Sequence, residues 1–190
     1  VSYKEGVIVK DNRDEKVQLT VDSSRVNLKK EGSYQVVYRA VDAAGNETSK
    51  KVTITVKPKP ANYIEPEVIH SLADSILKDI IDETMTQREK AEKIYWWIKK
   101  HIGYVNKSDK SDWLLGAYQG MKKRSGDCFV YFATAKELLT RAGIENIDIV
   151  KSDGGHYWNM VNCGDGWYHF DTTPQIGGGE FFMLTDAELE

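Results

Sequence analysis

The sequence predicts two domains: a small all-β domain, followed by an α+β domain in which helices pack on an antiparallel sheet. The first observation is charge. Residues 1–60 hold 12 basic and 8 acidic residues, whereas residues 61–190 hold 14 and 21, giving net charges of about +4 and −7. The second observation is composition, because all five Trp, both Cys and all four His follow residue 60. A change in both properties at one point indicates a domain boundary.

The third observation is a stiff segment at this point. Three of the four prolines lie between residues 58 and 66, and each disfavours helical backbone at the residue before it. We therefore expect an all-β domain over 1–57, a Pro/Lys linker over 58–65 and an α+β domain over 66–190.

The overall composition excludes several classes of protein. Hydrophobic residues make up 41% of the 190 residues and charged residues 29%, as in globular proteins rather than disordered or fibrous ones. The net charge of −3 gives no basic field for binding nucleic acid. No apolar run approaches the roughly 20 residues of a membrane-spanning helix. The chain opens at Val1 without Met or a signal-like segment, so we expect it to be excised from a longer protein.

Short strands alternate with turns in the first domain. Hydrophobic residues recur at every second position in 17–21, 34–38 and 52–56, which is the period of a half-buried strand. Turn-forming residues separate these segments, among them Asp22-Ser23-Ser24 and Ala44-Gly45-Asn46. This spacing predicts a small β-sandwich.

The text EGSYQVVYRAVDAAGNETSKKVTITVKP resembles the immunoglobulin-like repeats of bacterial cell-surface proteins. The resemblance covers residues 1–57 and is most specific from Gly32 to Val56, where a G-x-Y-x-V-x-Y strand leads into a D-x-x-G-N turn. It implies an immunoglobulin-like sandwich that serves as a spacer or adhesive module without chemistry of its own. Because 57 residues are few for such a domain, we expect its first strand to be missing.

The second domain begins with three predicted helices. Pro66 opens the first, in which apolar residues follow at helical spacing. Thr86 and Glu89 form a capping box that opens the second, which ends before Gly103. The third is expected over 112–123. Their Trp and Tyr residues are interpreted as core.

A further helix is expected over 129–142. Cys128 stands at its N-terminal end, and Gly143 ends it. At a helix N-terminus, unpaired N–H groups and the helix dipole stabilise a thiolate and can hold an oxyanion beside it. We expect Gly126 to leave room for a substrate carbonyl. Asp127 opposes the thiolate unless it caps the helix. The alternative interpretation of Cys128 is a buried structural cysteine.

Two strands, 156–162 and 167–173, flank a predicted four-residue turn at 163–166. With that turn, paired residue numbers sum to 329, and His156 and Asp171 become diagonal neighbours on one face. A carboxylate that backs an imidazole fixes its tautomer and stabilises its protonated form, as a base serving a thiol requires. The alternatives are a hydrogen-bonded strand histidine and a turn-forming aspartate.

The segments SGDCFVYFATAKELLTRAG, HYWNMV and GWYHFDTTP resemble the core of the transglutaminase-like superfamily. Its pattern is G-x-C opening a helix, H-x-W-N on a strand and W-x-x-x-D on the next strand. The resemblance runs from about Tyr63 to Glu190. It implies that Cys128 is the nucleophile, His156 the base and Asp171 its orienting partner.

The resemblance further implies a papain-like fold and a thioester acyl-enzyme formed on Cys128 from a carboxamide or peptide carbonyl. An amine as the second nucleophile gives crosslinking, whereas water gives deamidation or proteolysis. Trp158 is a candidate wall of the acyl site, although sheet packing also explains it. Tyr104 and Gln119 are candidates for polar contacts to substrate or oxyanion.

Other interpretations of these residues remain open. A zinc site from Cys128, His156, Cys163 and His169 has suitable ligand types but lacks metal-like spacing. A Cys128–Cys163 disulfide would disable the enzyme. The ordinary papain family is disfavoured because the histidine follows the cysteine by only 28 residues. The main rival is a surface module that keeps the fold and binds a ligand or cell wall without turnover.

We expect a protein or peptide substrate that is associated with the cell wall, and no nucleic-acid partner. No EF-hand loop is present, and neither a metal nor another cofactor is expected. An immunoglobulin-like module before a thiol enzyme is typical of the bacterial cell surface or exterior, and this assignment rests on family analogy. A monomer is expected.

Overall fold

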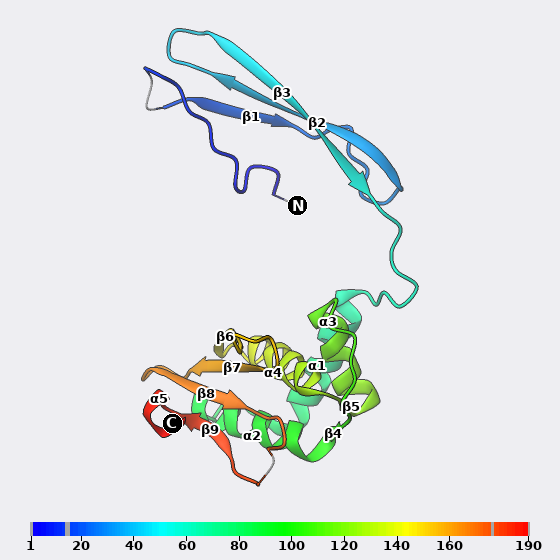
Figure 1. The fold of residues 1–190 in the computed structure, drawn as a ribbon, viewed down its shortest axis with the longest axis vertical. Helices are drawn as coiled ribbons and strands as arrows, with labels where there is room; N and C mark the ends of the chain where they lie inside the picture. Colours follow the sequence, from blue (N-terminus) through cyan, green and yellow to red (C-terminus); the bar gives the residue numbers. More distant parts are fainter. Residues whose placement is uncertain (1, 14–15, 176, 190) are drawn as a thin grey trace. The chain divides into compact units, whose positions relative to one another are not determined.

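The structure is a computed structural model that describes residues 2–13, 16–175 and 177–189. It divides into two compact units, residues 1–61 and 62–190. In the part of the chain that the structure describes, the regular elements of the first unit are all strands, whereas the second unit contains helices and strands (Figure 1). Among the described residues, no helix is both long and apolar enough to cross a membrane.

The first unit forms one antiparallel sheet in the order β1-β2-β3, with β1 at Gln18–Asp22, β2 at Gly32–Val41 and β3 at Glu47–Val56. Each strand includes or overlaps a segment with the predicted two-residue period. β2 and β3 form a long hairpin in which all ten residues of each strand are paired. The described residues of this unit contain no second sheet. They therefore do not show the predicted sandwich, and the immunoglobulin-like assignment remains a prediction.

The turn between β2 and β3 is encoded locally. The Asp42 carboxylate accepts hydrogen bonds of 2.7 Å from both the backbone N–H and the side-chain amide of Asn46. Gly45 has a φ of 88°, which a residue without a Cβ adopts most readily. These three residues are the D-x-x-G-N turn of the sequence, and they close the hairpin without help from packing.

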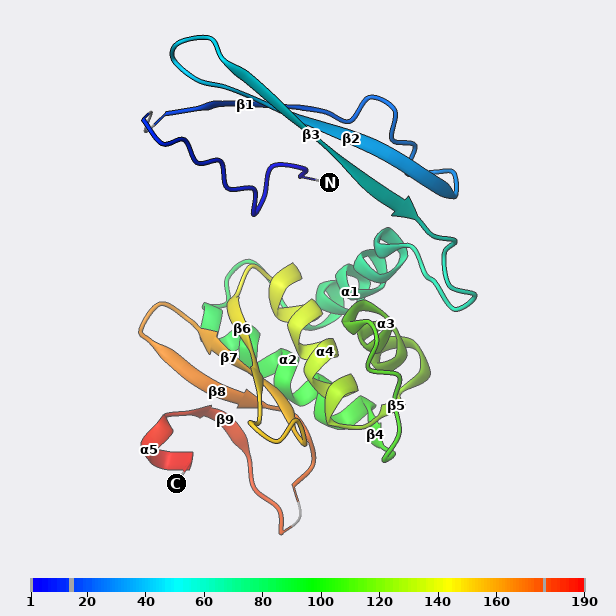
Figure 2. The same ribbon diagram turned by 45° about the horizontal axis from the view of Figure 1, so that its top comes forward.

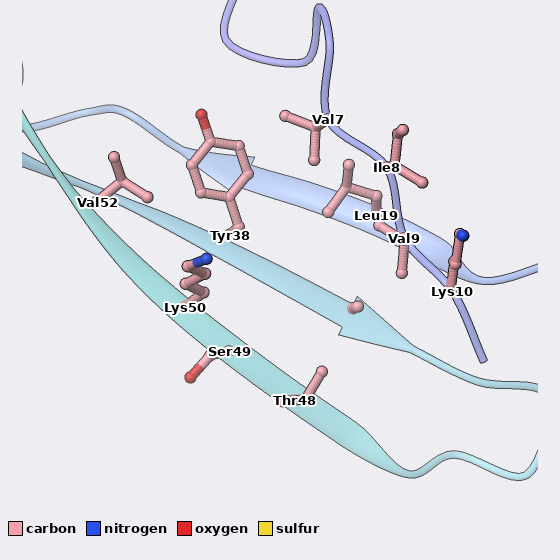
Figure 3. Close-up of a pocket in the computed structure, with 11 residues that line it drawn as sticks. Val7, Ile8, Val9, Lys10, Leu19, Tyr38, Thr48, Ser49, Lys50 and Val52 are labelled. Carbon is pink, nitrogen blue, oxygen red and sulfur yellow. The ribbon is translucent and has the colours of Figure 1, made fainter. Parts of the chain in front are cut away.

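One face of this sheet carries a wide apolar groove. The extended segment around Val7 to Lys10 runs along the sheet and forms one wall of the groove (Figure 3). Its volume is about 510 Å³, and its apolar lining includes Val7, Ile8, Val9, Leu19, Tyr38 and Val52. Only Val36 and Ala40 are buried hydrophobic residues among the described part of this unit. Its sheet thus leaves much apolar surface in contact with solvent.

The helices of the second unit begin where local capping predicts. α1 (Pro66–Ile80) has its proline in the first turn. α2 (Gln87–His101) begins at a complete capping box, in which Thr86 accepts from the backbone N–H of Glu89 and the Glu89 carboxylate accepts from that of Thr86. The remaining helices are α3 (Trp113–Tyr118), the π-helical turn η1 (Gln119–Lys123), α4 (Cys128–Arg141) and the short α5 (Asp186–Leu189).

Four antiparallel strands form the main sheet of the second unit, in the order β6-β7-β8-β9. Their bounds are β6 Glu145–Val150, β7 Tyr157–Asn162, β8 Trp167–Asp171 and β9 Phe181–Leu184. The predicted register of the central hairpin is confirmed, because Asn162 pairs with Trp167 and Asn159 with Phe170.

α4 is the central element of the second unit and contacts α1, α2 and α3 as well as β6 and β7 (Figure 2). Eleven of its fourteen residues are buried. A neighbouring segment packs on α4 so closely that only glycine fits: a Cβ on Gly120 would lie 2.0 Å from the Thr134 hydroxyl oxygen. The residues of the first turn of α4, 128–131, are all buried as well, so a group placed there is held firmly.

Three predicted elements differ in detail. The helix expected over 112–123 is divided into α3 and η1, and Arg124 ends it with a left-handed φ of 58°. β7 begins one residue after His156, and β8 ends at Asp171 rather than residue 173. His156 consequently lies directly before β7, and Asp171 is the last residue of β8.

Candidate active site

Cys128 is the first residue of α4, as the sequence predicts. Its side chain is almost buried, with the residue 6% exposed, and both cysteines of the chain are free. The Sγ atom lies 4.0 Å from the carbonyl oxygen of Gly155, to which the thiol can donate. The thiol therefore meets the N-terminal end of a helix on one side and the residue before His156 on the other.

Asp127 caps α4, and its charge is engaged by other groups. Its Oδ1 accepts from the backbone N–H of Phe129 at 3.1 Å and from the Ser108 hydroxyl at 2.6 Å. Lys110 Nζ lies 3.7 Å from the other carboxylate oxygen. These contacts limit the repulsion between Asp127 and a thiolate at the next residue.

Gly126 has a different role from the predicted one. A Cβ at this position would lie 2.3 Å from the Cβ of Val130 on α4. The space that the glycine leaves is thus filled by Val130 and is not open to a substrate carbonyl. Gly126 allows the chain to pack closely on the first turn of α4.

His156 and Asp171 meet as the hairpin register predicts. His156 Nε2 lies 2.7 Å from Asp171 Oδ2, and Cys128 is close enough to the histidine to contribute to its raised pKa. Because Nε2 faces the carboxylate, Nδ1 is the nitrogen left for the thiol. The structure thus brings together all three residues that the sequence predicts as nucleophile, base and orienting partner.

The surroundings of His156 favour its protonated form. The hydrogen bond with Asp171, followed by the interaction with Cys128, raises the pKa of His156 from 6.5 to about 9, although burial acts in the opposite direction. An imidazolium beside a thiol favours the thiolate by charge attraction. The site therefore favours an imidazolium close to the Cys128 side chain at neutral pH.

Asp171 is held by two further hydrogen bonds. The residue is 7% exposed; its Oδ1 accepts from the backbone N–H of Thr173, and its Oδ2 accepts from the side-chain amide of Gln175, both at 2.9 Å. Together with the bond from His156, these contacts fix both carboxylate oxygens. The sequence gives only a weak signal for Gln175, its place directly after Pro174 in the turn that follows the strand.

Trp158 stacks on His156. The ring centroids are 5.5 Å apart, and the planes meet at 24°. The indole N–H donates to Nδ1 of His169 at 2.9 Å, so the ring is held by a hydrogen bond as well as by packing. Trp158 therefore lies against the candidate base, and whether it also walls an acyl site remains a prediction.

Tyr104 and Gln119 lie in different settings. Tyr104 belongs to β4 (Gly103–Tyr104), which pairs in parallel with β5 (Ser125–Gly126) just before Cys128. Burial, followed by the nearby Cys128 and Asp127, raises the pKa of its hydroxyl. Gln119 donates its amide to the carbonyl oxygen of Ser125 at 3.0 Å, so this amide is engaged by the main chain. Tyr104 is therefore the better placed of the two for contact with a ligand at Cys128.

Within the described residues, no group of three or more His, Cys, Asp or Glu side chains is arranged to hold a metal ion. The zinc set of Cys128, His156, Cys163 and His169 is accordingly not assembled. Cys163 lies in the hairpin turn, partly buried, and burial raises the pKa of its thiol.

A cavity of about 240 Å³ adjoins the candidate base. Its lining includes His156 and Asp171, together with Trp158, His169, Gln175 and Leu189. Most of this lining is apolar surface. The cavity thus gives an open space beside the His156–Asp171 pair that is large enough for a bulky side chain.

Comparison with known proteins agrees with this arrangement. The model of the transglutaminase-like superfamily matches residues 74–172, which include Cys128, His156 and Asp171. The chain therefore belongs to the transglutaminase-like superfamily. The family resemblance predicted from the sequence is confirmed for this part of the chain.

Two solved structures are distantly similar. A proposed cysteine protease from Cytophaga hutchinsonii is 15% identical, with a TM-score of 0.42 over 88% of this chain and 69% of that chain. The periplasmic domain of TgpA from Pseudomonas aeruginosa, bound to ethylmercury, is 14% identical, with a TM-score of 0.38 over 81% of this chain and 64% of that chain. Likenesses at these scores support no statement about activity. No curated protein matches the chain.

Proposed function

We propose that the protein is a thiol enzyme that acts on carboxamide or peptide bonds of proteins or peptides through a thioester on Cys128. The observation that carries the proposal is the position of His156: its ring is bonded to the Asp171 carboxylate at 2.7 Å, and the Cys128 Sγ lies 4.0 Å from the carbonyl oxygen of the preceding residue, Gly155. A nucleophile, a base and a group that orients the base are the parts that covalent thiol catalysis requires.

In the first half-reaction the Cys128 thiolate attacks the carbonyl carbon, and an S–C bond forms. The C–N bond then breaks, and the departing nitrogen takes its proton from the His156 imidazolium, so that ammonia or an amine leaves. The N–H groups of Phe129, Val130 and Tyr131 all donate to Asp127. The backbone N–H of Cys128 is therefore the proposed oxyanion donor in the first turn of α4. Asp171 keeps the imidazole oriented throughout.

In the second half-reaction water or an amine attacks the thioester carbonyl and gives its proton to His156. The S–C bond breaks, and the thiolate–imidazolium pair is restored. Water produces an acid, by deamidation or proteolysis, whereas an amine produces a new amide and hence a crosslink. Tyr104 and Trp158 are the proposed contacts for substrate beside the thiol.

We place this reaction at the bacterial cell surface or exterior, in a monomer, with a protein or peptide substrate that is associated with the cell wall. The support for the location is the resemblance of residues 32–56 to repeats of bacterial surface proteins. The 1–57 domain then serves as a spacer or adhesive module, the 58–65 segment as a linker and the 66–190 domain as the enzyme.

The test uses a library of glutaminyl peptides with a labelled primary amine, and it follows ammonia release, amine incorporation and peptide cleavage by mass spectrometry. We expect turnover in the wild type and in Cys163→Ser, and none in Cys128→Ala. A mass increase on Cys128 identifies the acyl-enzyme. Absence of turnover together with an unreactive Cys128 would favour the binding module.

A further inference from the structure

Behind the candidate base, Trp158, His169 and Asp186 form a chain of hydrogen bonds. The Trp158 indole N–H donates to His169 Nδ1, and His169 Nε2 lies 2.9 Å from Asp186 Oδ1. Because an indole can only donate, His169 Nδ1 must be unprotonated, and the proton of the neutral ring is on Nε2. The two partners thus specify one tautomer of His169, with Nε2–H donating to the Asp186 carboxylate.

Trp158 restrains the plane of the His156 ring, which the hydrogen bond to Asp171 alone does not fix. A single hydrogen bond to Asp171 fixes the direction of Nε2 but leaves the imidazole free to turn about that bond. The stacked Trp158 indole supplies the second constraint, since it fixes the plane of the ring. With direction and plane both set, Nδ1 points to the thiol.

The indole is in turn held by His169, a residue that is 7% exposed on β8. Asp186, the first residue of α5, lies at the surface with a side chain that is 88% exposed. The exposed Asp186 therefore holds a buried histidine, His169, which in turn holds the partly buried Trp158 ring. Leu189 of the same helix lines the cavity beside His156, so α5 contributes to this region twice.

We propose that His169 and Asp186 are positioning residues that hold Trp158 against His156 and thereby keep the base directed at Cys128. This inference rests on the proposed function, because it assigns roles within that same site. Neither residue touches the reacting atoms. Their effect passes through the Trp158 ring.

Substitutions at residue 169 separate the two hydrogen bonds of the histidine. His169→Asn places an amide oxygen near the position of Nδ1 and keeps an acceptor for Trp158, whereas His169→Leu removes both bonds. We expect His169→Leu to slow alkylation of Cys128 by iodoacetamide at pH 6 to 7 by about tenfold, the scale of one lost hydrogen bond. His169→Asn is expected to restore most of that rate.

Asp186→Ala is a second variant that does not disturb the core, because the side chain is exposed. We expect it to slow alkylation about threefold, since His169 loses the partner that fixes its tautomer. The matched control is His101→Leu. His101 also stacks on a tryptophan, Trp97, at 4.8 Å and 24°, but belongs to α2 and has no bond to the candidate site. Its substitution should leave the rate unchanged.

A readout independent of the thiol is the indole N–H proton resonance of Trp158, assigned with Trp158→Phe. We expect a hydrogen-bonded shift in the wild type and in His169→Asn, and a changed shift in His169→Leu. Unaltered alkylation in both His169→Leu and Asp186→Ala, with wild-type Cys128 still activated by His156, would overturn this inference and leave the proposed function standing. A wild-type Cys128 that does not respond to His156→Ala would overturn both.

Discussion

The two units of this chain each contain an antiparallel sheet, but the sheets are stabilised differently. Among the described residues, the first unit buries two hydrophobic residues and the second buries 25. The first sheet has long, regular strands and a locally encoded turn, and it leaves an apolar groove open. The second sheet has short strands, and α4 packs on it with an almost wholly buried surface.

This difference bears on where precise chemistry is possible. A site needs side chains held within a fraction of an ångström, and close packing supplies that restraint. Cys128 is fixed by the buried first turn of α4, and Asp171 by three hydrogen bonds at the end of β8. The first unit offers its side chains no comparable support.

The largest effect is expected from removal of the nucleophile. Cys128→Ala is expected to reduce turnover at least about a thousandfold, because the covalent route is lost. Turnover is measured on the peptide library with and without the substitution. Cys163→Ser is the matched control and should retain the wild-type rate. Activity that survives in Cys128→Ala would place the chemistry elsewhere in the chain.

The next largest effect is expected from Asp171→Asn. Loss of the carboxylate should lower the pKa of His156 from about 9 toward 6.5. We expect it to reduce turnover by about a hundredfold or more. The pKa is measured from the Cε1–H proton resonance of His156. A pKa that remains near 9 in the variant would contradict the role given to Asp171.

The His156–Asp171 pair predicts that the stability of the protein depends on pH. Because the pKa of His156 is raised on folding, from 6.5 to about 9, its contribution is fully present below about pH 6.5. It is lost as the pH rises through about 9. Urea unfolding of the wild type and Asp171→Asn should therefore differ at pH 6 and converge above pH 9. A difference in unfolding free energy between the two proteins that grows with pH would contradict this assignment.

Leucine-to-alanine substitutions should destabilise the two units to different extents. Leu138 on α4 is fully buried, and Leu138→Ala is expected to destabilise the second unit by about 3 kcal/mol. Leu19 in the first unit is only half-buried, and Leu19→Ala should cost less than about 1 kcal/mol. All five Trp follow residue 60, so Trp fluorescence in urea reports the second unit, and backbone amide signals report the first. An equal loss of unfolding free energy in Leu138→Ala and Leu19→Ala would contradict the difference in packing between the two units.

The smallest effect is expected at the turn of the first sheet. Gly45→Ala places a Cβ in open space but at a φ of 88°, so its cost of about 1 kcal/mol comes from the backbone alone. Amide exchange in the β2–β3 hairpin measures it, with Ala44→Gly as the neighbouring control. The Trp fluorescence transition should not move. A shift of that transition would show that the units are energetically coupled.

Much of the second unit could be predicted because its signals are local. Thr86 and Glu89 specify the start of α2, and the four-residue turn at 163–166 specifies the register that brings His156 to Asp171. The family pattern added Cys128 as their partner. These signals depend on residues close in sequence, and tertiary packing did not override them.

Other features could not be predicted because tertiary contacts decide them. The π-helical turn of η1 lies where Gly120 packs against Thr134, and Gly126 is needed for Val130 rather than for substrate. The bonds of Gln175 to Asp171 and of His169 to Trp158 form only once β8 and its following turn are in place. In the first unit, periodicity predicted strands but could not reveal whether a second sheet covers them.

The most direct test of the central claim is the pH dependence of Cys128 alkylation by iodoacetamide, with intact-mass readout, in the wild type and in His156→Ala. If His156 and Cys128 form an activated pair, the wild-type thiol reacts rapidly near pH 6, and the reaction slows when His156 is removed. A midpoint at about pH 8.5, where free thiols titrate, and no effect of His156→Ala would contradict the enzyme assignment. The binding module would then be the better account of this fold.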